Sequence, residues 1–358
     1  MSKLASPTSE IEAPQMRSPR LGQPLRPLRI VAMGGGTGLS TILRGLKRYV
    51  PHNVNDVPDN AADSSRIADL TAIVTVTDDG GSSGRLRKEF NILPPGDIRN
   101  CLVALSEDEA LLSRIFQYRF DTGAGLEGHN FGNLFVTALA AVTGDFAEAV
   151  RESSKILATR GTIFPSTVSN VQLEASMDDG SVVFGETNIT ASKHRIVRLR
   201  MVPEDAQPLP QSLEAIAEAD MITIGPGSLF TSLVPNLLVH GIPEAIAASK
   251  AVKVYVCNLM TQANESLGLT AADHISKLYE HAGKPIFDYA IVNTAPISGS
   301  LQAKYALEGA SKIVVDCEAI EALGVRCIMG NFVAEGGVVR HATDRVAAEL
   351  LKLAASIA

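Results

Sequence analysis

The chain has 358 residues, of which 46% are hydrophobic and 20% are charged, and it contains 29 glycines and 18 prolines. This composition excludes a disordered, collagenous or coiled-coil protein and predicts a globular one. The formal net charge is −7, so we expect no nucleic-acid partner and no general attraction to anionic membranes. An anionic ligand would have to be held by local features of the chain.

The first part of the chain differs in composition from the rest. Residues 1–27 are rich in Pro, Ser and Arg and lack hydrophobic periodicity, so we predict a disordered arm. The arm has no apolar segment typical of a secretory signal, and no segment reaches the roughly 18 uninterrupted apolar residues of a membrane span. We therefore expect a cytoplasmic protein without a membrane span. The polar residues 51–68 predict a surface loop.

Short apolar strands alternate with helical patterns along the remaining chain. We predict strands at residues 28–33, 70–76, 221–224, 252–257, 289–292 and 327–329. We predict helices at residues 98–106, with Asp97 as N-cap, and at 108–118, 130–143, 145–158 and 204–219.

One region reads as antiparallel β structure. A turn at residues 178–180 predicts a hairpin, and with a strand at 196–201 it forms a small β insertion at about 162–202. The repeated strand-then-helix units predict a mainly parallel sheet with helices on both faces. We therefore expect a single Rossmann-like α/β domain at residues 28–358 that carries this insertion.

The four cysteines show no metal-binding or disulfide pattern. Cys101, Cys257, Cys317 and Cys327 have no C-x-x-C spacing and lie in apolar surroundings. We predict buried, reduced thiols.

The loop after the first strand is glycine-rich. Gly35, Gly36, Thr37 and Gly38 precede a helical pattern, so backbone N–H groups at a helix N-terminus could bind phosphate. The loop matches neither a Walker A motif nor a dinucleotide fingerprint, because no Lys-Ser or Lys-Thr follows and Leu39 replaces the last glycine. A structural tight turn is the alternative interpretation.

Two acidic residues follow the second strand. Asp78 and Asp79 could bind Mg²⁺ through oxygen or accept hydrogen bonds from ribose hydroxyls, and the glycine- and serine-rich segment at 80–84 favours a ligand contact. An Asp turn that caps the following helix is the alternative.

Two further loops carry polar candidates. His129 could act as a proton donor or simply as a helix cap. The loop at residues 225–228 is another candidate anion site, and Asn258 follows the next strand toward the same edge of the sheet.

Six segments together resemble the gluconeogenesis factor family over nearly all of residues 28–350. They are GGGTGLS (34–40), DDGGSSGRLR (78–87), LPPGDIRNCL (93–102), FQYRF (116–120), GPGSLFTS (225–232) and VCNLMTQ (256–262). This family is grouped with 2-phospho-L-lactate transferase, an enzyme of the deazaflavin cofactor. The resemblance implies a cytoplasmic bacterial protein that is needed for normal growth and cell shape on gluconeogenic carbon sources. It also implies binding of UDP-linked sugars, notably UDP-N-acetylglucosamine, without an established reaction.

The family's candidate ligand residues carry over where the motifs match, and together with those found above they form one set. The set is Gly35, Gly36, Thr37, Gly38, Asp78, Asp79, Gly81, Ser82, Ser83, Arg99, Asn100, His129, Asn133, Gly225, Pro226, Gly227, Ser228 and Asn258, with Asp78, Asp79 and Asp97 as metal candidates. Family members commonly have Ser where this chain has Asn130, which excludes a serine nucleophile at that position.

Two functions remain open at this stage. A regulatory protein would bind a nucleotide-sugar and signal to a protein partner that the sequence does not identify. A transferase would act on a nucleotide-activated donor, with Mg²⁺ held across the diphosphate. A scaffold without a ligand is a third alternative. The apolar pattern at residues 228–239 fits either a homodimer contact or core burial.

Overall fold

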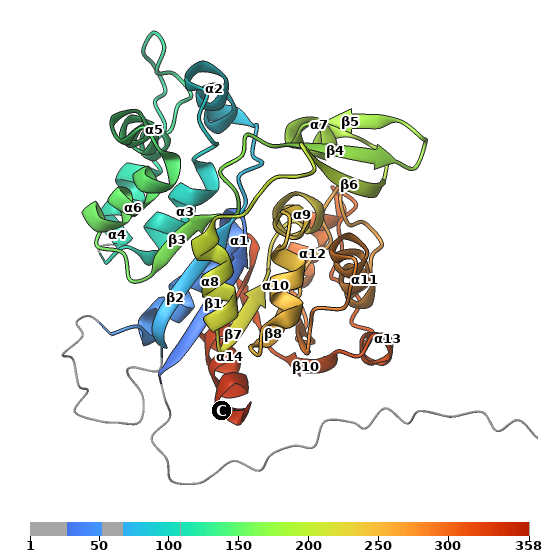
Figure 1. Ribbon diagram of the computed structural model, residues 1–358. Coiled ribbons are helices and arrows are strands. Elements are labelled where there is room, and N and C mark those ends of the chain that lie inside the picture. Colours follow the sequence, from blue (N-terminus) through green and yellow to red (C-terminus); the bar gives the residue numbers. More distant parts are fainter. Residues whose placement is uncertain (1–26, 52–66, 108, 358) are drawn as a thin grey trace, which may run out of the picture.

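The computed structural model describes residues 27–51, 67–107 and 109–357, and its main sheet has seven parallel strands (Figure 1). The predicted arm at 1–27 and the predicted loop at 51–68 lie almost entirely outside the described residues. The strands of this sheet are β1 (Leu28–Gly34), β2 (Ile67–Val74), β3 (Thr162–Pro165), β7 (Met221–Ile224), β8 (Val252–Val256), β9 (Tyr289–Asn293) and β10 (Arg326–Gly330).

The order of the strands is β10-β9-β8-β7-β1-β2-β3. From β1 the chain moves outward through β2 to β3, returns to β7 beside β1, and then moves outward in the other direction to β10. This is the doubly wound order of Rossmann folds, and it confirms the predicted fold class. The strands nearest the centre are almost entirely buried, as expected for parallel strands that are covered on both faces.

Helices cover both faces of the sheet. One layer contains α1 (Gly36–Leu46), α3 (Gly96–Leu105) and α14 (Thr343–Ile357), and the other contains α8 (Pro210–Glu218), α9 (Val234–Leu238), α10 (Ile242–Ala248) and α11 (Ala271–Ala282). Helix α1 shows why these helices form. Its Leu39, Ile42, Leu43 and Leu46 recur at helical spacing and are fully buried.

The remaining helices lie mostly between β2 and β3 or toward the C-terminus (Figure 1). They are α2 (Gly81–Phe90), α4 (Glu109–Phe116), α5 (Phe131–Thr143), α6 (Phe146–Ile156), α7 (Glu186–Ala191), α12 (Gly299–Ala306) and α13 (Cys317–Ala322). Helix α3 begins at Gly96 after Pro95 and has no side-chain cap. The prediction that Asp97 is its N-cap is therefore wrong, because Asp97 lies within the first turn.

The predicted β insertion is present, with one correction. Strands β4 (Gln172–Met177), β5 (Val182–Phe184) and β6 (Ile196–Val202) form an antiparallel sheet in the order β5-β4-β6. Strand β3, in contrast, pairs parallel with β2 as the edge of the main sheet. The insertion therefore begins after Pro165 and not at residue 162.

A second small ribbon was not predicted. Strands β11 (Val333–Glu335) and β12 (Val339–His341) pair antiparallel near the C-terminus. Within the described part of the chain, no single helix is long and apolar enough to cross a membrane. Two bent helix pairs, α5 with α6 and the helix at Leu229–Leu238 with α10, reach that standard only jointly, by length and composition.

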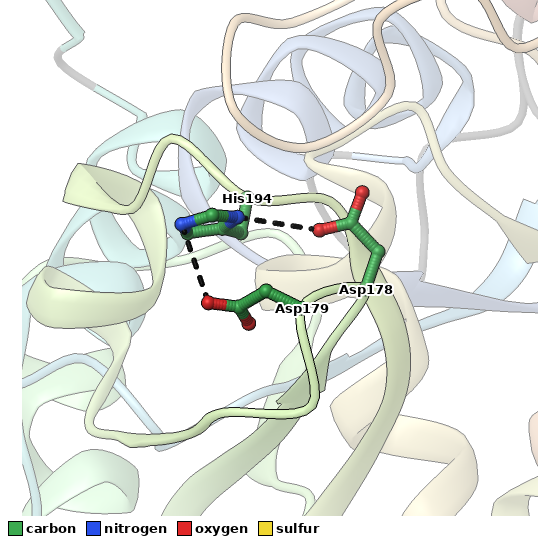
Figure 2. Close-up of side chains that lie close together, drawn as sticks. All are labelled: Asp178, Asp179 and His194. Atoms are coloured by element: carbon green, nitrogen blue, oxygen red, sulfur yellow. Dashed lines mark ion pairs between the residues drawn. The ribbon is translucent and has the colours of Figure 1, made fainter.

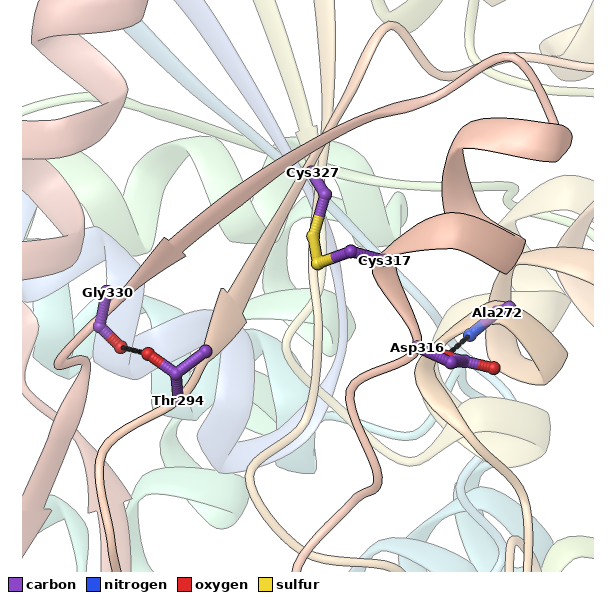
Figure 3. The surroundings of a disulfide bond; sticks show 6 residues. All are labelled: Ala272, Thr294, Asp316, Cys317, Cys327 and Gly330. Carbon is purple, nitrogen blue, oxygen red and sulfur yellow. Dashed lines mark hydrogen bonds between the residues drawn. A yellow bond between two sulfur atoms is a disulfide. The ribbon is translucent and has the colours of Figure 1, made fainter.

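The cysteines divide into two pairs. Cys101 and Cys257 are free and buried, as predicted. Cys317 and Cys327 form a disulfide with their Cα atoms 5.7 Å apart, so the prediction of four reduced thiols is wrong for this pair (Figure 3). The fold brings the start of α13 beside the edge strand β10, and residue spacing alone does not reveal that contact.

We predict that replacing Cys317 and Cys327 together by Ser lowers the free energy of unfolding by about 2–3 kcal/mol under oxidising conditions, because the unfolded chain loses a loop constraint. Urea unfolding measures the difference, and peptide mapping without reductant confirms the bond in the parent protein. Addition of reductant should lower the free energy of unfolding of the parent protein to that of the double variant. A parent protein whose stability does not respond to reductant would contradict the pairing.

Candidate functional site

The candidate site lies where the strand order reverses, at the carboxyl ends of β1 and β7. In doubly wound folds the crevice at this switch point is where ligands bind. The loop after β1 leads into α1, and the loop after β7 leads into a π-helical turn at Leu229–Leu233. Such turns are frequent at functional sites.

The two glycine loops touch each other. A Cβ atom on Gly38 would lie 2.2 Å from the carbonyl oxygen of Pro226, so only glycine allows this approach. Gly36 has φ +58°, and the N-cap residue Gly35 offers no side-chain cap to α1. The first N–H groups of α1 therefore lie beside the second loop without a side-chain acceptor from their own cap.

Side chains after β8 fix the second loop. Asn258 accepts a hydrogen bond from the Gly227 N–H at 2.9 Å and donates to the Gly227 carbonyl at 2.6 Å. Gln262 donates to the Ser228 hydroxyl at 2.9 Å. These bonds make the 225–228 loop and the 258–262 segment one rigid wall.

The loops border a cavity of about 590 Å³, within the range of small-molecule sites. The cavity is lined by Gly35, Gly36, Thr37, Gly38, Thr41, Asp78, Asp97, Glu186, Pro226, Gly227, Ser228, Ser232, Asn258, Leu259, Met260, Thr261, Gln262, Tyr305, Val338, Val339, Arg340 and His341. We call it the large cavity. It unites nine members of the predicted ligand set with the metal candidate Asp97.

Three carboxyl groups line the large cavity. Burial raises the pKa of Asp97 to about 7, with the charge of Asp78 adding to the rise and the Gly36 N–H and Arg99 opposing it. Burial also raises the pKa of Glu186 to about 9, again with Asp78 and Asp97 adding to the rise. Strongly shifted carboxyl groups in a cleft mark a functional site in many proteins.

A second, smaller cavity of about 240 Å³ adjoins the same carboxylates. It is lined by Asp78, Gly80, Gly81, Ser82, Ser83, Gly96, Asp97, Arg99, Asn100, Arg119 and Asn133. We call it the small cavity. Asp78 and Asp97 line both cavities. The residues of the predicted ligand set therefore lie in two separate cavities.

Three members of the predicted set line neither cavity. Asp79 accepts hydrogen bonds from the N–H and hydroxyl of Thr187 at 2.9 and 2.6 Å, so its carboxylate anchors the start of α7. His129 is buried, with its Nδ1 3.1 Å from the Ser82 hydroxyl. Burial lowers the pKa of His129, and Arg85 acts in the same direction. Gly225 has φ +86° at the turn out of β7.

Among the described residues, one group of three acidic or histidine side chains converges closely enough for a metal ion. It consists of Asp178, Asp179 and His194, all exposed (Figure 2). Figure 2 shows the imidazole between the two carboxylates, with its nitrogens 3.5 Å from Asp178 and 3.3 Å from Asp179. These residues line neither cavity.

Several cavity residues were not predicted from the sequence. Glu186 comes from the insertion, Tyr305 from α12, and Arg340 and His341 from the β12 ribbon. Burial lowers the pKa of His341 to about 4, and its Nε2 lies 3.0 Å from the Cys257 carbonyl. These residues follow no strand end with a motif, so no local signal marks them.

The fold and the paired glycine loops define a doubly wound α/β protein with a ligand site at its switch point. Residues 30–333 match the family model described as 2-phospho-L-lactate transferase CofD, and the chain belongs to this family.

Two relatives that the chain matches over nearly their whole length are named gluconeogenesis factor. The chain is 48% identical to the gluconeogenesis factor of Halalkalibacterium halodurans over 324 residues, which cover 90% of this chain and 95% of that protein. It is 46% identical to the gluconeogenesis factor of Bacillus subtilis, with 91% and 98% of the two chains covered. A crystal structure of a protein from Bacillus halodurans is similar with a TM-score of 0.84 at 47% identity, covering 91% of this chain and all of that one.

We predict that Gly38→Ala lowers the free energy of unfolding by about 1–3 kcal/mol, because the new methyl group forces the two glycine loops apart. Gly299→Ala is the matched control, since a Cβ atom there meets nothing within 4 Å. The control should stay within about 0.5 kcal/mol of the parent protein in urea unfolding. Equal effects of the two substitutions would refute the close approach.

We predict that Glu186→Gln stabilises the ligand-free protein at pH 8 by on the order of 2 kcal/mol and has little effect at pH 5. Because folding raises the pKa of Glu186 from 4.5 to about 9, the folded state retains a proton that the unfolded chain releases. The parent protein therefore loses stability as the pH rises between these values, and glutamine removes that loss. Urea unfolding at the two pH values measures it, with the exposed Glu214→Gln as control.

Proposed function

We propose that this chain is a cytoplasmic regulatory protein that binds a UDP-sugar such as UDP-N-acetylglucosamine and supports normal growth and cell shape on gluconeogenic carbon sources. The observation that carries the proposal is the contact between the two glycine loops at the switch point. A Cβ atom on Gly38 would lie 2.2 Å from the Pro226 carbonyl oxygen, and residues of both loops line the large cavity.

The diphosphate is assigned to this glycine-loop end. The N–H groups at the start of α1 favour negative charge, which supplies the local attraction that a chain of net charge −7 needs. The uridine and sugar hydroxyls would be bound by other side chains that line the cavity, such as Tyr305 and Arg340. Asp78, and not Asp79, would accept hydrogen bonds from ribose hydroxyls. The Asp79 carboxylate already accepts hydrogen bonds from the N–H and hydroxyl of Thr187.

The residues present fit a magnesium ion. Asp78 and Asp97 line the large cavity together and offer hard oxygen ligands, the kind that Mg²⁺ prefers. Burial is the main cause of the raised pKa of Asp97 and of Glu186, and the negative charge of Asp78 adds to both rises. Mg²⁺ bound there would neutralise this charge together with that of a diphosphate. The two carboxylates would hold the ion, and the glycine loops would orient the diphosphate.

A Mg²⁺-dependent transferase that acts on a nucleotide-activated donor is the second candidate. It is favoured by the position of Asp78 and Asp97 between two cavities, one for a donor and one for a second substrate. Asn130 caps α5 by accepting from the Asn133 N–H at 3.3 Å, so this position supplies no nucleophile. The same phosphate contacts serve binding and turnover, and the two functions separate only by measurement.

We predict that UDP-N-acetylglucosamine raises the melting temperature of the full chain and that Mg²⁺ increases the rise. A ligand at 100 times its Kd stabilises a folded protein by about 2.7 kcal/mol. UMP and GTP are the comparison ligands. Asp78→Asn should remove the Mg²⁺-dependent part, whereas Asp179→Asn, in the exposed cluster, should leave it unchanged. No stabilisation by any of these nucleotides would refute the nucleotide site.

Phosphorus NMR of the bound complex over several hours decides between the two functions. An intact UDP-sugar supports the regulatory role. Steady release of free nucleotide would establish the transferase instead.

A further inference from the structure

We infer that the outward-facing edge of strand β10 is an interaction surface, and that its partner is the same strand of a second copy of this chain. Strand β10 is the last strand at one end of the main sheet and pairs with β9 on its inner side. The two copies would pair antiparallel through their β10 strands and so join their sheets. The inference goes beyond the proposed function and does not depend on the ligand.

The pairing with β9 shows which backbone groups of β10 face outward. The Gly330 carbonyl accepts a hydrogen bond from the Thr294 N–H, just after β9, at 2.9 Å, and Figure 3 shows these two residues side by side. Because successive residues of a strand direct their N–H and C=O groups to opposite sides, Cys327 and Met329 direct theirs away from β9. The backbone hydrogen bonds of the described residues include none that these outward N–H and C=O groups form.

Strand β10 has none of the features that commonly protect an exposed edge strand, which are proline, lysine and β-bulges. The strand at the other end of the sheet, β3, ends in Pro165, which has no N–H group. Pro165 faces outward, because the N–H of the next residue, Ser166, donates inward to the Val74 carbonyl at 2.8 Å. On β10, in contrast, Met329 has a free outward N–H and is 62% exposed although it is apolar. The chain therefore protects one end of its sheet and leaves the other open to a further strand.

Strand β10 is complementary to itself. In an antiparallel pair related by a two-fold axis beside Ile328, Cys327 of each copy lies opposite Met329 of the other. Each of these pairs exchanges two hydrogen bonds, so every outward N–H and C=O group of the two residues gains a partner. Ile328 lies opposite its own counterpart, and Arg326 lies opposite Gly330, so no like charges face each other. A second copy therefore satisfies the edge without any other protein.

The size of the edge indicates the strength of the contact. Strand β10 has 5 residues, whereas a standard protein interface has roughly 20–30 residues on each side. We therefore expect a reversible dimer whose population rises with protein concentration. No residue of β10 lines the large cavity, so association and ligand binding can be measured separately.

Sedimentation equilibrium of the full chain, from low to high micromolar concentration, tests the inference. We expect a monomer–dimer equilibrium, and we expect Met329→Lys to raise its dissociation constant by about tenfold or more, because lysine on an edge strand opposes pairing. Leu307→Lys is the matched control, since Leu307 is apolar, 88% exposed and outside β10, and it should change the constant by less than about twofold. A chain that stays monomeric over this range, or equal effects of the two substitutions, would overturn the inference.

A cross-link tests the register of the two strands. With Cys317 and Cys327 replaced by Ser to prevent exchange, Ile328→Cys should link two copies in oxidised glutathione, because opposite residues at such positions have Cα atoms about 4.5 Å apart. Val142→Cys in the same background is the control, since Val142 is 82% exposed on α5, and it should stay monomeric on a non-reducing gel. Equal cross-linking of the two variants, or none in either, would contradict the pairing. Failure of the nucleotide-sugar to bind would refute the proposed function alone.

Discussion

The contact between Gly38 and the Pro226 carbonyl is the constraint on which the rest of the site depends. It joins a loop from each half of the doubly wound sheet, and it leaves no space for a side chain at residue 38 in the first turn of α1. Asn258 and Gln262 hold the second loop, so the contact is braced from a third strand. The backbone N–H groups of the glycine loops at the switch point are therefore held rigidly.

The rigid frame holds two carboxyl groups of the large cavity in surroundings that disfavour their ionisation. Asp97 and Glu186 reach the large cavity with pKa values of about 7 and 9, which means that folding alone places these groups where ionisation is unfavourable. Such shifts are frequent at functional sites, and a bound cation would favour the charged form of these carboxyl groups. Arg99 shows the same feature with the opposite sign, because burial lowers the pKa of its guanidinium, an effect that the charge of Asp97 opposes and that of Arg119 reinforces.

The sequence predicts the central sheet well because its strands are buried on both faces and read as apolar runs. Strand β7 was predicted with its observed bounds, Met221–Ile224, and the glycine loops follow directly from strand ends. Contacts between separate elements, in contrast, could not be predicted from the sequence. The pairing of β3 with β2 and the position of Glu186 at the cavity depend on elements distant in sequence, and hydrophobic periodicity does not indicate them. The Cys317–Cys327 bond joins residues only 10 apart in sequence, but it depends on the packing of α13 beside β10, which periodicity does not indicate either. The same limit explains Asp79, whose partner Thr187 lies 108 residues away.

The insertion that supplies Glu186 is fixed to the rest of the molecule at several points. Asp79 binds the first turn of α7, and Asn264 donates to the Thr190 carbonyl at 2.9 Å near its end. The N–H of Leu199 in β6 donates to His281 of α11 at 3.0 Å. Three attachments to separate elements oppose a free hinge motion of the insertion as a lid. Glu186 is therefore a fixed part of the cavity wall before any ligand arrives.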